Sequence, residues 1–218
     1  MLEYLELISE HIDTLMYGAS ITVMIAVTAI LLGMALGLAL CFGLLSRHRW
    51  IRRPCLAYQS LWRGTPILVQ LLIVFYALPV IGLDVPAIVA ATAALTMNTS
   101  AFQAEIYRGG MLTLGHGQFE AARILGIGVW PARIRILIPQ MFRLVLPSLV
   151  NETISILKNT SLVSIIAVTE LMRVSQQIVA TNYRALEIYT ATAVIYILMN
   201  TVLSMAGRYA ERRFAATS

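Results

Sequence analysis

Long stretches without a charged residue constrain this chain more than any other feature. Residues 14–46 form a run of 33 residues without Lys, Arg, Asp or Glu. Stretches of 20 uncharged, mostly apolar residues follow at 64–83, 85–104 and 188–207. A helix of about 20 residues crosses a hydrocarbon core about 30 Å thick, and lipid offers no partner to an open backbone. Because the runs lack the alternation of barrel strands, they predict membrane-spanning helices.

A fifth apolar stretch is interrupted by Arg143 and Glu152. We therefore predict an all-α membrane protein, a single transmembrane domain over residues 1–218. Its five transmembrane helices are expected at 18–45, 64–83, 85–105, 138–158 and 187–207. Residues 161–180 begin apolar but carry Glu170 and Arg173. We interpret them as a helix packed against the bundle near the far surface, and a sixth span is the alternative.

The first predicted span contains Gly33 and Gly37, which form a Gly-x-x-x-Gly step. Such a step lets a second helix approach closely, so it predicts a helix contact and no specific function.

The distribution of basic residues predicts the orientation. Thirteen of the sixteen Lys and Arg residues lie in the segments 47–63, 108–143 and 208–213. Basic loops are retained in the cytoplasm, so these segments should face it. The first seventeen residues carry four acidic and no basic residues. We therefore expect the N-terminus outside and, with five spans, the C-terminus inside.

Composition excludes several other classes of protein. Hydrophobic residues make up 59% of the chain and charged residues 12%, whereas soluble domains average about 45–50% and about 25%. A water-soluble monomer and a disordered chain are both disfavoured. The net charge of +5 is explained by loops at a membrane, so we expect no nucleic-acid partner. The three histidines are scattered and predict no metal site.

Residues 109–137, between the third and fourth predicted spans, are unusually rich in glycine. Six glycines surround a short helical pattern at 118–125. Gly126 can supply the positive φ that ends such a helix, and Pro131 suits the first turn of the next one. Two short helices with small residues at their junction predict a compact knob. A helical hairpin that only ties two spans together is the alternative.

In this segment the chain resembles the membrane subunits of ATP-binding cassette (ABC) importers. Glu120-Ala121-Ala122, with Gly126 beyond it, resembles the EAA loop of that superfamily. Further blocks resemble the polar amino acid permeases of the histidine, glutamine and arginine group: RGTPILVQ at 63–70, AEIYRGG at 104–110, GQ at 117–118, LP at 146–147 followed by Asn151, and LKNTSL at 157–162. The order of the blocks and the predicted five-helix layout are similar to a type I ABC importer permease core.

The resemblance implies transport driven by a separate ATPase. In this family the loop is a coupling helix seated in a cleft of the ATPase subunit, so we call residues 109–137 the coupling region. The implied coupling residues are Gly117, Glu120, Ala121, Ala122, Arg123 and Gly126. The chain has no Gly-x-x-x-x-Gly-Lys-Ser/Thr phosphate loop, and its only lysine is Lys158. We therefore expect no cofactor on this chain and ATP with Mg²⁺ on the partner.

The same resemblance implies the other partners. They are a dimer of ATP-binding subunits, a second permease (the same chain or a homologue), an external or periplasmic amino acid-binding protein, and the lipid bilayer. The implied location is the bacterial cytoplasmic (inner) membrane, with several passes.

Glu152 is the most informative residue for the substrate. Insertion scales assign about 2.5–3.5 kcal/mol to a comparable polar group at a helix centre, so a carboxylate there needs a partner or a wet cavity. Asn159 lies nearly two turns later on the same face, and in some of the permeases resembled these positions line the substrate cavity. We expect Glu152 to meet the α-ammonium group of an amino acid, while Asn159, Thr160 and Ser161 address its carboxylate or side chain. Many relatives have Asp in place of Asn159, which weakens any case for a cationic substrate.

Gln70 and Asn98 are weaker candidates for the substrate site, and hydrogen bonding between helices is the alternative for both. For Glu152 the alternative is a structural ion pair or a protonated acid. At the level of function, the alternatives are a membrane-embedded enzyme using Glu152 and a non-transporting scaffold. No second carboxylate or histidine pair lies at a corresponding depth in the sequence, and a scaffold would not need the small-residue knob.

Overall fold

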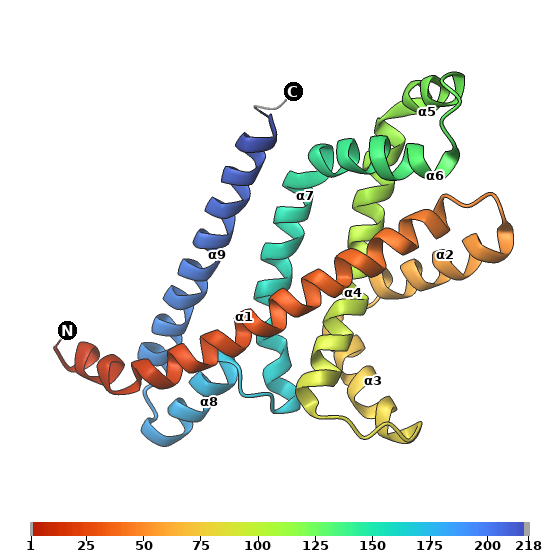
Figure 1. Cartoon of the computed structure of the whole chain (residues 1–218). Helices are drawn as coiled ribbons and strands as arrows, with labels where there is room; N and C mark the ends of the chain where they lie inside the picture. Colours follow the sequence, from red (N-terminus) through yellow and green to blue (C-terminus); the bar gives the residue numbers. More distant parts are fainter. Residues whose placement is uncertain (1, 216–218) are drawn as a thin grey trace.

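The computed structural model describes residues 2–215, and the side chains of 2–5, 115–116, 118–119, 123 and 214–215 lie outside the described part. The described residues form helices and no strand, which confirms the all-α prediction. In chain order the elements are α1 Leu2–Leu44, α2 Arg49–Gly64, α3 Ile67–Val80, α4 Ala87–Thr113, α5 Gly115–Ile124, α6 Val129–Ala132, the π-helical turn η1 Arg133–Leu137, α7 Ile138–Asn159, the 3-10 segment η2 Thr160–Ile166, α8 Leu171–Asn182 and α9 Ala185–Ala215 (Figure 1).

Three helical segments of the described chain are long and apolar enough to cross a membrane. They are Glu6–Leu44, Val129–Ile166 and Ala185–Arg213. The pair α2 and α3 adds a fourth if it counts as one span, although the two helices meet at 114°. Helix α4 has 27 residues, which is about 40 Å, but it carries several buried polar side chains. The count of five spans therefore stays a prediction.

Helix α1 packs along α4 at the predicted glycine step. A Cβ at Gly37 would lie 3.0 Å from both the Gln103 Cβ and the Ser100 carbonyl oxygen. A Cβ at Gly33 would collide with the Thr99 side chain. Only glycine leaves room for this approach, which confirms the predicted helix contact.

Three buried apolar clusters lie along α1, so this helix contacts every large part of the molecule. The first joins α1 to α3, α4, α7 and η2 around Ile25 and Ile156. The second joins α1 to α8 and α9 around Leu15 and Leu171. The third joins α1 to α4 and α7 around Tyr107. Figure 1 shows α1 running obliquely across α7 and α4.

Helix α1 also begins well before residue 18, the predicted start of the first span. The partly buried Leu7 and Ile8 pack against the cluster that α8 and α9 form, which explains why the acidic N-terminal residues continue the helix. Residues 161–180 form η2 and most of α8, and α8 has 12 residues. A helix of about 18 Å is too short to cross a bilayer alone.

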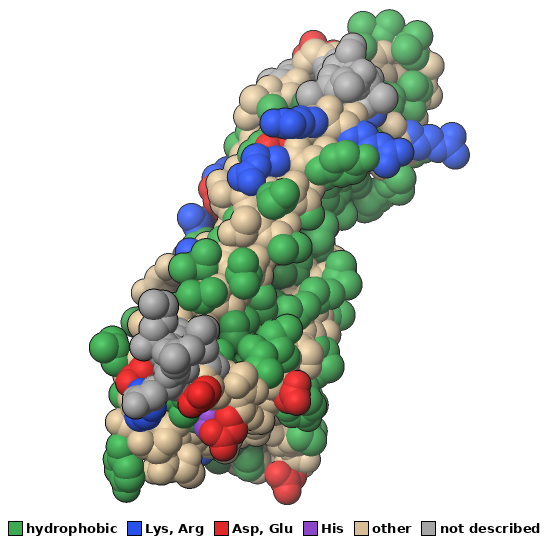
Figure 2. Space-filling view, turned by 90° about the vertical axis from the view of Figure 1, so that its left-hand side faces the viewer, with side chains coloured by type: hydrophobic (Ala, Val, Ile, Leu, Met, Phe, Trp, Pro, Cys, Tyr) green, Lys and Arg blue, Asp and Glu red, His purple; other side chains and the backbone are tan. Residues whose placement is uncertain are grey.

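The surface separates charge along the molecule. Figure 2 shows apolar side chains over the middle, most of the visible Lys and Arg toward one end, and several Asp and Glu toward the other. This is the arrangement from which the orientation was predicted, and the orientation itself stays a prediction.

Candidate functional site

The coupling region folds as two short helices around a glycine turn. Helix α5 ends at Ile124, two residues before Gly126, whose φ is +72°. The Ile127 N–H donates to the Ala122 carbonyl oxygen at 2.9 Å, which is the six-to-one hydrogen bond of a Schellman turn. The sequence predicted this helix end, because a side chain at Gly126 would oppose the left-handed conformation.

The predicted coupling residues divide into an inner and an outer set. Ala122 faces inward and is 3% exposed, whereas Gly117, Glu120 and Ala121 are exposed. The side chain of Arg123 lies outside the described residues. Ile124 at the end of α5 and Leu125 just after it are the most exposed large apolar side chains described in the coupling region, at 85% and 76%. Apolar side chains exposed this strongly indicate a surface that a partner covers.

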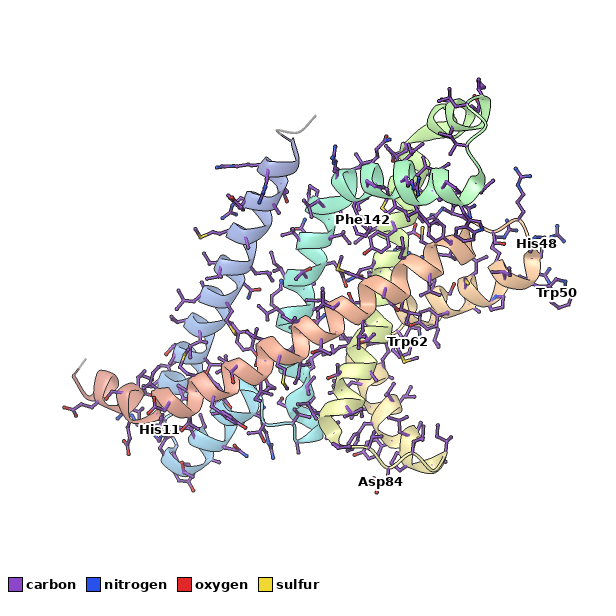
Figure 3. The ribbon with its side chains drawn as sticks, viewed as in Figure 1. His11, His48, Trp50, Trp62, Asp84 and Phe142 are labelled. Carbon is purple, nitrogen blue, oxygen red and sulfur yellow. The ribbon has the colours of Figure 1, made fainter. Side chains whose placement is uncertain are left out.

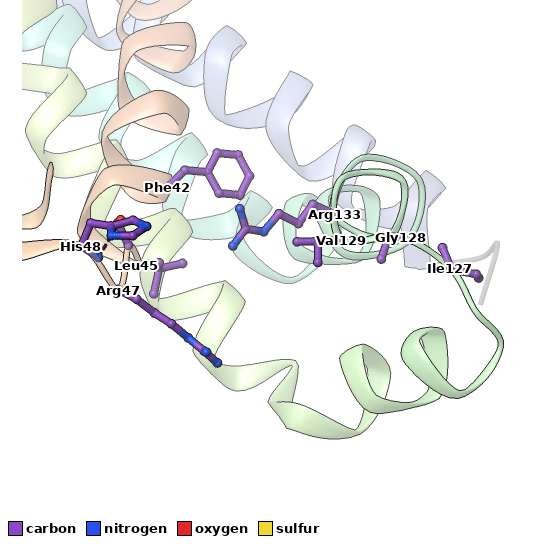
Figure 4. A pocket seen from close by; sticks show the side chains of 10 residues that line it. Phe42, Leu45, Arg47, His48, Ile127, Gly128, Val129 and Arg133 are labelled. Carbon is purple, nitrogen blue, oxygen red and sulfur yellow. Dashed lines mark hydrogen bonds between the residues drawn. The ribbon is translucent and has the colours of Figure 1, made fainter.

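An aromatic and cationic stack joins the coupling region to the end of α1. The Phe42 and Trp130 rings meet edge to face at a centroid distance of 6.3 Å. The Arg133 guanidinium lies 5.3 Å from the Phe42 ring and 5.5 Å from the Trp130 ring, a cation–π geometry. A cavity of about 580 Å³ lies beside the stack, between the residues after α1 and those before α6 (Figure 4). No local pattern predicted this contact, because the residues are about 90 positions apart.

Glu152 reaches from α7 to a polar line on α4. The Thr99 hydroxyl donates to Glu152 Oε1 at 2.9 Å, and Gln103 Nε2 donates to Thr99 Oγ1 at 3.2 Å. Thr99 and Gln103 are buried, and Gln103 Oε1 has no hydrogen-bond partner among the described residues. The predicted carboxylate therefore has a hydroxyl partner, and the line lies where α1 approaches α4 at Gly33 and Gly37.

Asn159, Thr160 and Ser161 lie at the junction of α7 and η2. The Thr160 hydroxyl is fully buried and donates to the Leu157 carbonyl oxygen at 2.7 Å. The Ser161 hydroxyl donates to the Lys158 carbonyl oxygen at 2.8 Å. Seven residues of helix separate Asn159 from Glu152 by about 10 Å along the axis. In the described part of the chain no hydrogen bond joins these three residues to Glu152.

Gln70 and Asn98 contact each other instead of facing Glu152. Asn98 Nδ2 donates to Gln70 Oε1 at 2.7 Å. Gln70 Nε2 donates to the Trp62 carbonyl oxygen at 2.8 Å and to Thr65 Oγ1 at 2.7 Å. Both side chains are buried. The pair ties the bend between α2 and α3 to α4, and this geometry favours the alternative role in helix packing.

The sequence did not predict that the buried carboxylate of Glu170 is a structural centre. It is 0% exposed and accepts hydrogen bonds from the N–H groups of Met172 and Arg173 at 3.0 and 2.8 Å. The hydroxyls of Thr22 and Tyr196 donate to it at 3.3 and 3.0 Å. Burial raises the pKa of Glu170, and these four donors oppose the rise.

Glu170 thus caps α8 and ties it to α1 and α9. In the sequence, Glu170 only argued against a membrane span at residues 161–180. A glutamate is not among the residues preferred at a helix start, so no local pattern marked it as a cap.

The described residues contain no group of three or more His, Cys, Asp or Glu placed to hold a metal ion. Figure 3 shows His11 and His48 at opposite ends of the structure. The side chain of His116 lies outside the described residues.

Known proteins resemble this chain along most of its length. It is 38% identical over 205 residues to the glutamine transport system permease protein of Escherichia coli K12, covering 93% of both chains. It is 34% identical over 207 residues to the arginine transport system permease protein of Bacillus subtilis 168, again covering 93% of both. The octopine transport system permease protein of Rhizobium radiobacter is 36% identical over 200 residues, which are 87% of this chain and 81% of the relative.

Solved structures have the same fold. A crystal structure of an amino acid ABC transporter matches with a TM-score of 0.86 at 34% identity, covering 94% of this chain and 96% of the other. An inward-facing methionine ABC transporter matches with a TM-score of 0.81 at 17% identity, over 94% of this chain and 98% of the other, which shows the fold alone. The family of binding-protein-dependent transport system inner membrane components matches residues 29–216. The chain therefore belongs to this family of importer membrane subunits.

Proposed function

We propose that this chain is the permease subunit of an ATP-driven importer that moves a polar amino acid across a bacterial cytoplasmic membrane. The observation that carries the proposal is the likeness to glutamine and arginine permeases over 93% of both chains. In the complex, two ATP-binding subunits would lie below a pair of permeases, which are two copies or one copy and a homologue. An external binding protein would deliver the amino acid.

The proposed topology has five spans, with the N-terminus outside and the C-terminus inside. Helices α3 and α4 would supply the second and third spans, on either side of the loop at Asp84. The coupling region would then lie in the cytoplasm. The chain would not hydrolyse ATP itself, because ATP and Mg²⁺ would be held by the partner subunits.

The coupling region is suited to receive a push from the ATPase. The exposed Ile124 and Leu125 would seat in the partner, and the buried Ala122 and the Gly126 turn would keep the seat rigid. A displacement of the coupling region would reach α1 through the stack of Phe42, Trp130 and Arg133. It would also reach α7 directly, because α6, η1 and α7 follow one another without a break. Tilting of these helices would open the passage to each side in turn.

The polar line at Glu152 is suited to the substrate. Glu152 would accept the α-ammonium group, and Gln103 has a buried oxygen free for a donor such as an ammonium N–H. Asn159, Thr160 and Ser161 would lie farther along the passage. An enzyme using Glu152 is less suited, because no second acid or base contacts Glu152 in the described part of the chain.

Co-purification tests the assignment. The tagged full chain, expressed with a cognate ATP-binding subunit, is expected to retain that subunit after solubilisation. In vesicles loaded with ATP, the complex with its binding protein should accumulate glutamine or another polar amino acid. A chain that retains no ATP-binding subunit, while a glutamine permease treated in parallel does, would contradict the proposal.

A further inference from the structure

Helix α2 is held in one rotation about its axis by polar contacts on its inward face. The Tyr58 hydroxyl lies 2.8 Å from Ser100 Oγ and donates to the Met97 carbonyl oxygen at 2.9 Å. Gln59 Nε2 donates to Glu105 Oε2 at 2.8 Å. These contacts with α4 fix which side chains of α2 point away from the bundle.

An apolar strip and a basic strip run side by side on the outward surface of α2. Trp50, Pro54, Ala57 and Leu61 follow helical spacing and are all exposed, Trp50 by 92% and Leu61 by 59%. Arg49 and Arg53 lie one position before Trp50 and Pro54, so they flank the apolar strip. A groove of about 530 Å³ lies at this border, lined by Arg49, Trp50, Arg53, Pro54 and Ala57.

The position of α2 places this groove at the edge of a membrane. Helix α1, which is long and apolar enough to span, ends at Leu44, and α2 begins at Arg49. Because α2 meets α3 at 114°, it lies across the direction of that helix (Figure 1). Trp50 and His48 lie at the outer corner of the structure, away from the other helices (Figure 3). A helix that carries apolar and basic strips and lies just beyond the end of a spanning helix is typical of the bilayer interface.

The charges at this corner are available to an external anion. Arg47, Arg49, Arg52 and Arg53 lie within seven residues. In the described part of the chain none of them forms an ion pair. A binding protein segment with acidic side chains would satisfy the arginines but not the apolar strip beside them, whereas a phospholipid satisfies both.

We propose that this groove binds the headgroup of an anionic phospholipid such as phosphatidylglycerol. Arg49 and Arg53 contact the phosphate, while Trp50 and the apolar strip contact the glycerol backbone and the first methylene groups. None of the residues that line the groove lines the cavity beside the coupling region or takes part in the hydrogen bonds at Glu152. It would anchor the corner between α1 and α2 in the interface while the spanning helices tilt.

Quenching of Trp50 by brominated lipids tests the proposal. The full chain carrying Trp62→Phe and Trp130→Phe keeps Trp50 as its only tryptophan, and only the backbone carbonyl of Trp62 serves Gln70. It is reconstituted in phosphatidylcholine vesicles containing an equal small fraction of brominated phosphatidylglycerol or brominated phosphatidylcholine. Attraction of the two arginines to an anionic surface corresponds to about a thirtyfold preference, so brominated phosphatidylglycerol should quench at about thirtyfold lower fraction.

Charge-matched variants locate the preference. Arg49→Gln with Arg53→Gln should remove it, whereas Arg208→Gln with Arg212→Gln, the same change of charge on α9, should leave it intact. Equal quenching by the two lipids in the parent chain overturns the proposal, whether or not the double variant folds. A preference that survives Arg49→Gln with Arg53→Gln also overturns it.

Two further arms separate the lipid from other anions. If millimolar glycerol phosphate displaces the brominated phosphatidylglycerol, the groove binds a soluble phosphate and the lipid assignment is wrong. If adding the ATP-binding subunits abolishes the preference, a protein covers the groove and the assignment is wrong as well. Persistence of the preference in both arms supports it.

Discussion

The buried carboxylate of Glu170 and the partly buried carboxylate of Glu152 have different numbers of hydrogen-bond donors. Glu170 accepts four hydrogen bonds from the protein, three at Oε2 and one at Oε1, and a carboxylate has about four acceptor positions in all. Glu152 accepts one from Thr99 within the described part of the chain. Glu152 therefore keeps acceptor capacity for a ligand, whereas Glu170 serves the fold.

Neutralising Glu152 should weaken substrate binding. Glu152→Gln keeps the size and the contact with Thr99 but removes the charge that would meet an ammonium group. A hydrogen bond to a charged group contributes about 1.5–3 kcal/mol, so the transport KM should rise about tenfold or more. Uptake by the reconstituted complex measures this. The control is Glu187→Gln, at a glutamate that forms a half-exposed ion pair with Arg184. An unchanged KM would remove Glu152 from the substrate site.

Removing the Glu170 carboxylate should destabilise the packing of α8 against α1 and α9. Glu170→Ala leaves the hydroxyls of Thr22 and Tyr196 and two N–H groups without their acceptor, at a cost of about 2–4 kcal/mol. The midpoint of thermal unfolding in detergent should fall by several degrees. Tyr196→Phe removes one of the four bonds and should cost about 1 kcal/mol. Equal midpoints for Glu170→Ala and the parent would contradict the role of this cluster.

Functional residues could be predicted from the sequence where they interrupt or end a local pattern. Glu152 was noticeable because it interrupts an apolar run, and Gly126 because it follows a helical pattern. Glu170 was not noticeable in this way. Its structural role depends on hydrogen bonds from Thr22 and Tyr196, which are distant in the sequence and approach Glu170 only in the folded chain.

At the level of elements, the helix types were predictable and their ends less so. Apolar runs mark where a helix can cross lipid, but α1 starts earlier because Leu7 and Ile8 pack against the apolar cluster that α1 forms with α8 and α9. Helix α2 fell within a stretch described only as a basic loop, although its outward strips have clear helical spacing. The glycine step on α1 was predictable, because close helix approach needs a local run of small residues.

A side chain at Gly126 should uncouple transport from ATP hydrolysis. Gly126→Val is strained at φ +72° although no atom crowds the position, so α5 should lose its defined end. The assembled complex is expected to show loss of substrate-stimulated ATPase activity with normal membrane levels. Gly126→Asn should retain most of the activity, because asparagine tolerates the left-handed region. Normal stimulation in Gly126→Val would contradict the coupling role.

At the level of the whole molecule, the family was predictable because its motifs are spread through the chain in a fixed order. The membrane topology is less readily derived. Five spans are predicted from the sequence, whereas helix length and composition in the structure identify three, or four if the bent pair counts as one span. Polar side chains lower the hydropathy of α4, and α3 is short because the chain turns at Thr65-Pro66.

Chemical labelling tests the proposed orientation. A single cysteine at the exposed Gly117, in a chain with Cys41→Ser and Cys55→Ser, should react with an impermeant thiol reagent in inside-out vesicles and not in intact cells. A cysteine at Ser9 in the N-terminal part of α1 should react in the opposite pattern. Labelling of the Gly117→Cys chain in intact cells would contradict both the orientation and the importer assignment.

The length of α1 has a mechanical consequence. Its 43 residues make a rod of about 65 Å, roughly twice the thickness of the hydrocarbon core. One end contacts the coupling region through Phe42, and Thr22, at the middle of the helix, hydrogen-bonds to Glu170. The rod can therefore act as a lever pivoting where Gly33 and Gly37 rest on α4, so that a tilt of a few degrees displaces its two ends in opposite directions.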